Sequence, residues 1–146
     1  MAELVVVVAV IGVTMGVAIP TLWTYYRASA LRGAAEQTVV LLNNARQLAI
    51  RLNTTVCVTV DATGMQYHQG SCSGTLYTGA ETDTAGYMTL PSDLSLSGTN
   101  NLCFNYLGAG AATPAPCVSN GTLTVTRSSG GTINVTIAST GRVRLQ

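Results

Sequence analysis

Glu3 stands out first, because it is the only charged side chain ahead of Arg27. Residues 4–26 are uncharged and rich in Val, Ala, Ile and Gly, a pattern typical of a membrane-spanning helix. A carboxylate at the end of such a helix is costly in lipid and by default serves a function. We therefore expect Glu3 to meet an opposite charge, which another chain can supply.

Four cysteines, Cys57, Cys72, Cys103 and Cys117, follow the apolar stretch. An even number of cysteines in a region outside the cytoplasm favours two disulfides. The spacing fits no zinc motif, since no C-x-x-C pair occurs and His68 is the only histidine, so no metal site is expected. Three pairings are open. Cys57–Cys72 and Cys103–Cys117 are favoured because each closes a short loop, which adds about 3 kcal/mol of stability.

Arg142 and Arg144 alternate with Val143 near the C-terminus, so on a strand both arginines point to one solvent face. Arg127 belongs to the neighbouring predicted hairpin. Such arginines can contact DNA phosphates with salt-sensitive, sequence-independent affinity. The alternative is that the charges keep an exposed sheet edge from pairing with other chains. The net charge of +1 favours this second reading.

Arrangements for catalysis are missing from the sequence. His68 has no second histidine or free cysteine beside it, and we expect a surface or turn residue. Glu81 and Asp83 match a calcium loop only weakly, because such a loop needs regularly spaced oxygen ligands. No nucleophile–base pair, phosphate-binding glycine loop or haem motif occurs. We therefore expect neither enzyme activity nor a cofactor.

One long helix must position Glu3. Residues 1–26 predict an apolar helix suited to a membrane or a filament core, and residues 27–53 predict its amphipathic continuation. At roughly 75 Å the helix is too long to pack on one small domain, so its first half must meet lipid or other subunits. Val40 and Ile50 are exceptions on the polar side. The expected buried face consists of Leu31, Ala34, Ala35, Thr38, Leu41, Leu42, Ala45, Leu48, Ala49 and Leu52.

Gly12, Gly16 and Pro20 interrupt the apolar half. Pro20 removes a backbone donor, and glycines lower the cost of leaving helical geometry. Residues 12–20 are therefore expected to be helical in lipid and locally unwound in an assembly. A simple kink at Pro20 is the alternative.

Residues 54–146 predict a β domain, since short alternating stretches are separated by turn signals such as Ser128-Ser-Gly-Gly131. The fold class expected is α+β: the amphipathic half of the helix packs on an antiparallel β-sheet domain stapled by two disulfides. The expected strands are 56–60, 65–69, 76–78, 87–90, 94–96, 102–106, 122–127, 132–138 and 142–145.

This pattern resembles the type IV pilins and pseudopilins. The resemblance is carried by Glu3, Gly12, Gly16 and Pro20 in an apolar helix that continues under a β domain, with the family's spacing from Glu3 to Pro20. Aligned in this way, the family's mature N-terminus falls ahead of Met1. Its terminal amine, usually on a methylated Phe, would then belong to residues before this sequence.

A second resemblance narrows the family. Residues 45–53, Ala-Arg-Gln-Leu-Ala-Ile-Arg-Leu-Asn, and residues 56–60, Val-Cys-Val-Thr-Val, resemble the helix end and first strand of the GspH/FimT group of minor pilins and pseudopilins. Gly141-Arg-Val-Arg144 resembles that group's C-terminal strand. In FimT-like proteins this ending is associated with DNA binding during uptake. Residues 70–119 match nothing specific.

The resemblance implies a structural subunit of a bacterial type IV pilus, for motility, adhesion or DNA uptake. Its partners would be copies of itself, other pilins and the pilus assembly machinery, with the inner membrane holding it before assembly at the cell surface. Glu3 would pair with the N-terminal amine of the neighbouring subunit. The alternatives are a pseudopilin of a type II secretion system and a FimT-like minor pilin that binds DNA.

Overall fold

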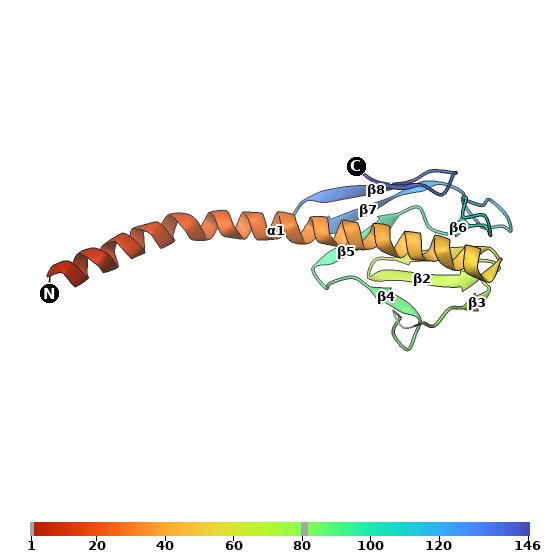
Figure 1. The fold of residues 1–146 in the computed structure, drawn as a ribbon, viewed down its shortest axis with the longest axis horizontal. Coiled ribbons are helices and arrows are strands. Elements are labelled where there is room, and N and C mark those ends of the chain that lie inside the picture. Colours follow the sequence, from red (N-terminus) through yellow and green to blue (C-terminus); the bar gives the residue numbers. More distant parts are fainter. Residues whose placement is uncertain (1, 80–81) are drawn as a thin grey trace. The chain divides into compact units, whose positions relative to one another are not determined.

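The computed structural model describes residues 2–79 and 82–146, and the chain divides into two compact units, Met1–Ala30 and Leu31–Gln146. Helix α1 (Ala2–Leu52) belongs to both units (Figure 1). Nine strands follow it in the described residues: β1 (Val56–Asp61), β2 (Gly64–Gln69), β3 (Thr75–Leu76), β4 (Tyr87–Thr89), β5 (Leu94–Gly98), β6 (Leu102–Phe104), β7 (Gly121–Arg127), β8 (Thr132–Ile137) and β9 (Val143–Leu145).

The strands form two antiparallel sheets in the second unit. The first sheet has the order β3-β2-β1-β6, and β4 also pairs with β2. The second has the order β5-β7-β8-β9, which leaves β9 at its edge. The expected α+β architecture, a long N-terminal helix on antiparallel sheets, is confirmed.

The core lies between residues 31–49 of α1 and the two sheets (Figure 1). Leu42, Ala45 and Ala49 of the helix are fully buried, as the three- and four-residue periodicity predicts. The Thr38 side chain is also buried, and its hydroxyl donates to the carbonyl of Ala34. Both sheets contribute completely buried partners to this core, namely Val56, Val58 and Met65 from the first and Leu123, Val125 and Val135 from the second.

The helix ends at Leu52 because Asn53 adopts a left-handed conformation with φ of 49°. The amide of Asn53 donates to the carbonyl of Ile50, and the amide of Thr54 donates to that of Ala49. These are the two bonds of a Schellman motif, with Asn in the position that Gly usually takes. Leu52 is 39% exposed, so its predicted place on the buried face is wrong: it is the last helical residue, where the chain leaves the core.

Two strands end two residues earlier than the sequence pattern predicts. Strand β3 ends at Leu76 rather than at residue 78, and β6 ends at Phe104 rather than at residue 106. Asn105 ends β6, because its side-chain oxygen accepts hydrogen bonds from the amides of Leu107 and Ala109 and draws the chain into a turn.

Candidate assembly surface

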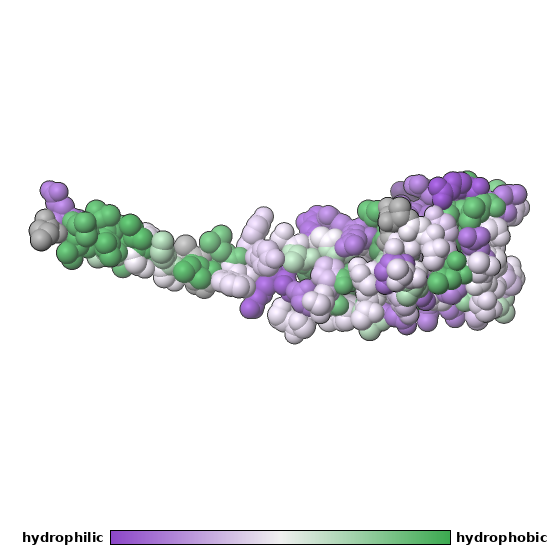
Figure 2. Space-filling model, turned by 90° about the horizontal axis from the view of Figure 1, so that it is seen from below, coloured by the Kyte–Doolittle hydropathy of each residue, from purple (hydrophilic) through white to green (hydrophobic). Residues whose placement is uncertain are grey.

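The large apolar side chains that the structure describes in the first unit are exposed. Between Leu4 and Ile19 these described side chains run from 46% exposed at Ile11 to 71% at Val13, and Figure 2 shows them gathered over the N-terminal end of α1. A continuous apolar patch of this extent marks an interaction site. We define the N-terminal apolar surface as Leu4, Val5, Val6, Val7, Val8, Val10, Ile11, Val13, Met15, Ile19, Leu22 and Trp23.

Over the residues that the structure describes, no helix is both long enough and apolar enough to cross a membrane.

Glu3 lies in the first turn of α1 and is exposed. Salt bridges among the described residues join Arg32 to Glu36 and Arg127 to Asp93, and neither includes Glu3. The partner charge expected for Glu3 therefore stays a prediction about an assembly.

Packing within the chain does not explain the glycines of the apolar half. A Cβ atom placed on Gly12 or Gly16 would meet no described atom within 4 Å beyond the neighbouring residues and backbone of its own helical turns. Helix α1 runs without a break through Gly12, Gly16 and Pro20. Both the helical state in lipid and the unwinding of residues 12–20 in the assembled state stay predictions, because they concern a chain surrounded by lipid or by neighbouring subunits.

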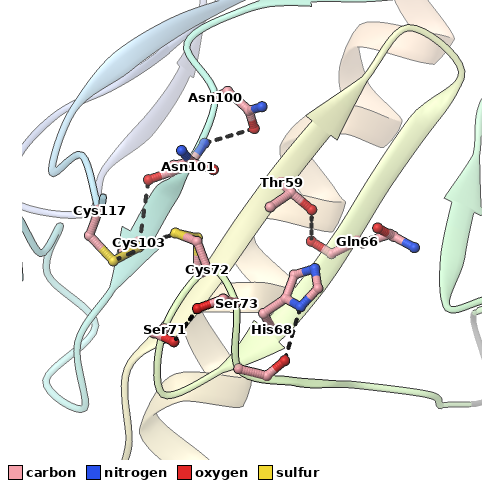
Figure 3. The surroundings of a disulfide bond; sticks show 12 residues. Thr59, Gln66, His68, Ser71, Cys72, Ser73, Asn100, Asn101, Cys103 and Cys117 are labelled. Atoms are coloured by element: carbon pink, nitrogen blue, oxygen red, sulfur yellow. Dashed lines mark hydrogen bonds between the residues drawn. A yellow bond between two sulfur atoms is a disulfide. The ribbon is translucent and has the colours of Figure 1, made fainter. Parts of the chain in front are cut away.

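The cysteines form two disulfides, Cys57–Cys72 and Cys103–Cys117, which are the two local pairings favoured from the sequence. The disulfides lie side by side (Figure 3), with the Cys72 Sγ atom 3.6 Å from that of Cys103 and 3.9 Å from that of Cys117. All four Sγ atoms lie within 4.8 Å of one another, and we call them the sulfur cluster. Spacing along the chain could not reveal it, because the cluster depends on β1 pairing with β6.

The structure separates the three arginines proposed to contact DNA. Arg142 and Arg144 are exposed at edge strand β9. Arg127 is different: its Nη2 atom lies 2.6 Å from Oδ2 of Asp93, and its side chain is only 11% exposed. In β7, Arg127 has the same parity as the buried Val125, so it lies on the core-facing side of the second sheet. A DNA contact on this sheet would therefore depend on Arg142 and Arg144.

Of the remaining polar candidates, His68 lies in strand β2 rather than in the surface or turn position expected for it, and Asp83 lies in a turn. The Nδ1 atom of the partly buried His68 lies 3.3 Å from the carbonyl oxygen of Gly74. The Asp83 carboxylate accepts hydrogen bonds from the amides of Ala85 and Tyr87. Glu81, the other acid of the weak calcium-loop match, lies outside the described residues. These contacts give His68 and Asp83 structural roles.

Tyr87 and Asp61 form a polar contact at the surface of the first sheet. The Tyr87 hydroxyl donates to Oδ2 of Asp61 at 2.9 Å. This hydrogen bond, followed by the negative charge of Asp61, raises the pKa of the Tyr87 phenol above its ordinary value. No sequence pattern indicates this pair, because the two residues meet only when β4 pairs with β2 beside β1.

Comparisons with known proteins agree with this architecture. The minor pseudopilin EpsH from the type 2 secretion system of Vibrio cholerae aligns at 16% identity and a TM-score of 0.57, over 79% of this chain and 94% of that chain. The type IV minor pilin FimU of Pseudomonas aeruginosa aligns at 17% identity and a TM-score of 0.60, over 84% and 92%. At such identities these likenesses show the fold alone.

The search of curated proteins found no match. The family model described as "Type II transport protein GspH" matches residues 34–141, which is well over half of the chain. The matched residues include most of the packed part of α1, strands β1 to β8 and both disulfides. The chain therefore belongs to the GspH family of type II transport proteins, and it shares its fold with the minor pseudopilin EpsH and the minor pilin FimU.

Proposed function

We propose that this chain is a subunit of a type IV pilus that polymerises through α1 into a surface filament for motility, adhesion or DNA uptake. The observation that carries the proposal is the N-terminal apolar surface, exposed along α1 with one charge at Glu3. Covering apolar area is worth about 25 cal/mol per Å², so this surface favours a state in which something covers it. Lipid of the inner membrane would cover it before assembly, and neighbouring α1 helices would cover it afterwards.

Glu3 would set the register of that packing. An unpaired charge in a dry helix bundle costs several kcal/mol, and a correctly placed opposite charge recovers much of that cost. The N-terminal amine of a neighbouring subunit is the cation that the family supplies. Helix packing would then hold the filament together, while the ion pair would select one axial position between subunits.

Replacing Glu3 tests this role directly. Glu3→Ala should leave the protein in the membrane fraction but sharply reduce the yield of filaments sheared from the cells. Glu36→Ala is the matched control, because Glu36 is an exposed acid on the same helix, paired with Arg32. It should leave the filament yield unchanged. Normal filament yield from Glu3→Ala would contradict the proposal.

A pseudopilin of a type II secretion system is the second candidate, favoured by the fold shared with EpsH. Deleting the gene separates the two, with twitching motility, natural transformation and protein secretion measured in the same strain. Loss of motility or transformation with intact secretion supports the pilus. Loss of secretion with intact surface filaments in electron micrographs supports the pseudopilus.

A DNA-binding minor pilin is the third candidate, and the outer face of the second sheet favours it. Arg142 and Arg144 are exposed there. In β5, β7 and β8, Ser and Thr residues alternate with buried residues, so their hydroxyls lie on the same outer face as the two arginines. Hydroxyl groups, like arginines, commonly contact DNA phosphates. These hydroxyls belong to Ser95, Ser97, Thr122, Thr124, Thr126, Thr132 and Thr136.

Gel-shift titrations at several salt concentrations test the DNA contact. The double variant Arg142→Gln/Arg144→Gln should bind DNA more weakly and reduce the salt slope by about 2, since each lost phosphate contact removes roughly one unit. The double variant Arg32→Gln/Arg51→Gln removes the same charge from α1 and should bind like the wild type. Equal losses in both variants, or no binding by the wild type, would exclude this surface.

A further inference from the structure

We propose that the sulfur cluster binds one soft divalent cation, of the zinc or cadmium class, when its two disulfides are reduced. The candidate ligands are Cys57, Cys72, Cys103 and Cys117. This site is independent of the filament role proposed above. In a reducing environment it would keep the same segments of the β domain cross-linked, through four sulfur–metal bonds in place of two sulfur–sulfur bonds.

The distances between the sulfurs are the first support. In a tetrahedral site with metal–sulfur bonds of about 2.3 Å, neighbouring sulfurs lie about 3.8 Å apart. The Sγ atom of Cys72 is already 3.6 Å from that of Cys103 and 3.9 Å from that of Cys117, although none of these atoms is bonded to Cys72. The two bonded pairs must separate, each by about 2 Å, and any pair near the 4.8 Å limit must close by about 1 Å.

The backbone that carries the cysteines suits such a site. Cys57 and Cys103 face each other across β1 and β6. The Cys103 amide donates to Val118 and its carbonyl accepts from Ala111, so both groups point away from β1. Cys57 and Cys103 therefore form the narrower, non-hydrogen-bonded kind of antiparallel pair, which keeps the two sulfurs on one side of the sheet.

The other two cysteines lie outside the strands. Cys72 lies between β2 and β3, and Cys117 lies between β6 and β7. Neither cysteine is hydrogen-bonded into a sheet between two neighbouring strands. Their sulfurs can therefore move by the roughly 2 Å that separates a disulfide from two ligands of one metal ion. Two fixed ligands and two adjustable ligands would close around one ion.

The chemistry requires an external dithiol. Each disulfide takes two electrons and two protons from one dithiol, which leaves as its own disulfide. The cation then displaces the four thiol protons and forms four sulfur–metal bonds, leaving a complex with net charge 2−. Thiolates select soft cations over Mg²⁺ or Ca²⁺. Cys72 is partly exposed while Cys57 and Cys103 are fully buried, so reduction would begin at Cys72.

The test uses the full chain in detergent, reduced with a dithiol, freed of excess reductant without air, and titrated with Cd²⁺. The reduced chain should show the ultraviolet thiolate-to-cadmium absorption, saturating at one ion per chain, and native mass spectrometry should give the same ratio. The disulfide-bonded chain should bind none. Zn²⁺ should displace the signal by competition.

Two variants identify the ligands in the reduced state. Cys72→Ser should weaken Cd²⁺ binding by more than about 100-fold, because losing even a group that only supports a metal ligand costs 10–100-fold. His68→Ala is the matched control: it removes the imidazole of the strand residue paired with Cys57 and should bind like the wild type. Wild-type binding by Cys72→Ser, or an equal loss in His68→Ala, would overturn the four-cysteine site.

If reduction unfolds the β domain, circular dichroism can still test the proposal by measuring whether Cd²⁺ refolds it. A structural metal refolds its own site, so Cd²⁺ should then restore the β signal of the reduced chain. A reduced chain that stays folded and binds no ion, or one that unfolds and is not refolded by the ion, overturns the proposal.

Discussion

Helix α1 contains two stretches, residues 4–23 and 31–49, that differ in the exposure of their apolar side chains. In the first stretch Leu4 is 70% exposed, whereas Leu42 in the second is fully buried. The first stretch is apolar on all sides, and the second is apolar on one side only. Because one small domain can cover only one face of a helix, periodicity indicates which apolar residues their own chain covers and which must be covered by something else.

Truncating one apolar side chain in each stretch should give the largest difference. Leu42→Ala should lower the free energy of unfolding by about 2–5 kcal/mol, since it leaves a cavity among buried neighbours. Val10→Ala should change it by less than about 0.5 kcal/mol, because Val10 is 58% exposed in the single chain. Chemical denaturation of the full chain in detergent measures both.

The order of the two variants should reverse when filament yield is measured instead of the free energy of unfolding. At equal amounts of folded protein, Val10→Ala should reduce assembly more than Leu42→Ala, since only Val10 belongs to the N-terminal apolar surface. Equal destabilisation of the isolated chain by the two variants would show that the two halves of α1 do not differ in this way.

The end of α1 gives the next largest effect. Asn53→Ala should lower the free energy of unfolding by about 1–2 kcal/mol, because Ala at a φ of 49° is strained. Asn53→Gly should have little effect or stabilise slightly, since Gly adopts this conformation readily. Denaturation of the three chains measures the difference, and an Ala variant as stable as the Gly variant would mean that the Schellman motif contributes nothing.

Much of the fold could be predicted because it depends on local pattern. The buried helix face and the positions of all nine strands follow from periodicity and turn residues, and they were found nearly in place. Leu52 was the exception, since periodicity alone does not show where the core ends. Parity could also have placed Arg127 with Val125 on the inner side of β7, a signal that was missed.

The sulfur cluster could not be predicted, because it depends on which strands are neighbours. Cys57 and Cys103 meet only through the pairing of β1 with β6, and the Asp93–Arg127 ion pair depends on β5 lying beside β7. Periodicity does not specify strand order. The partner of Glu3 could not be located in the structure of a single chain, since the proposed contact lies between subunits.

Glycines on the two halves of α1 should give a smaller effect. Gly12→Ala and Gly33→Ala both place a methyl group in open space, and each should favour the helix by about 1 kcal/mol. Gly33→Ala should therefore raise the free energy of unfolding of the second unit. Gly12→Ala should reduce filament yield if neighbouring helices approach closely there, while Gly33→Ala should not. Normal assembly of Gly12→Ala would mean that close approach does not require this glycine.

Two acids on α1 should give the smallest effect on the stability of the single chain. Glu36 lies 3.2 Å from Arg32, with both side chains more than half exposed, so Glu36→Gln should cost only about 0.3 kcal/mol. High salt should abolish even this cost by screening the pair. Glu3→Gln should leave the free energy of unfolding of the second unit unchanged, because Glu3 acts only on the dipole of its own first helical turn, an effect that salt screens. Denaturation at low and high salt measures these differences.

The contrast becomes sharp when the same acids are compared in assembly. Glu3→Gln keeps the size of the side chain and removes only its charge, so a loss of filaments would assign the effect to the ion pair rather than to packing. Glu36→Gln should assemble normally. If Glu3→Gln also assembled normally while Glu3→Ala did not, the side chain would act by its shape, and the register of the filament would have to come from the N-terminal apolar surface alone.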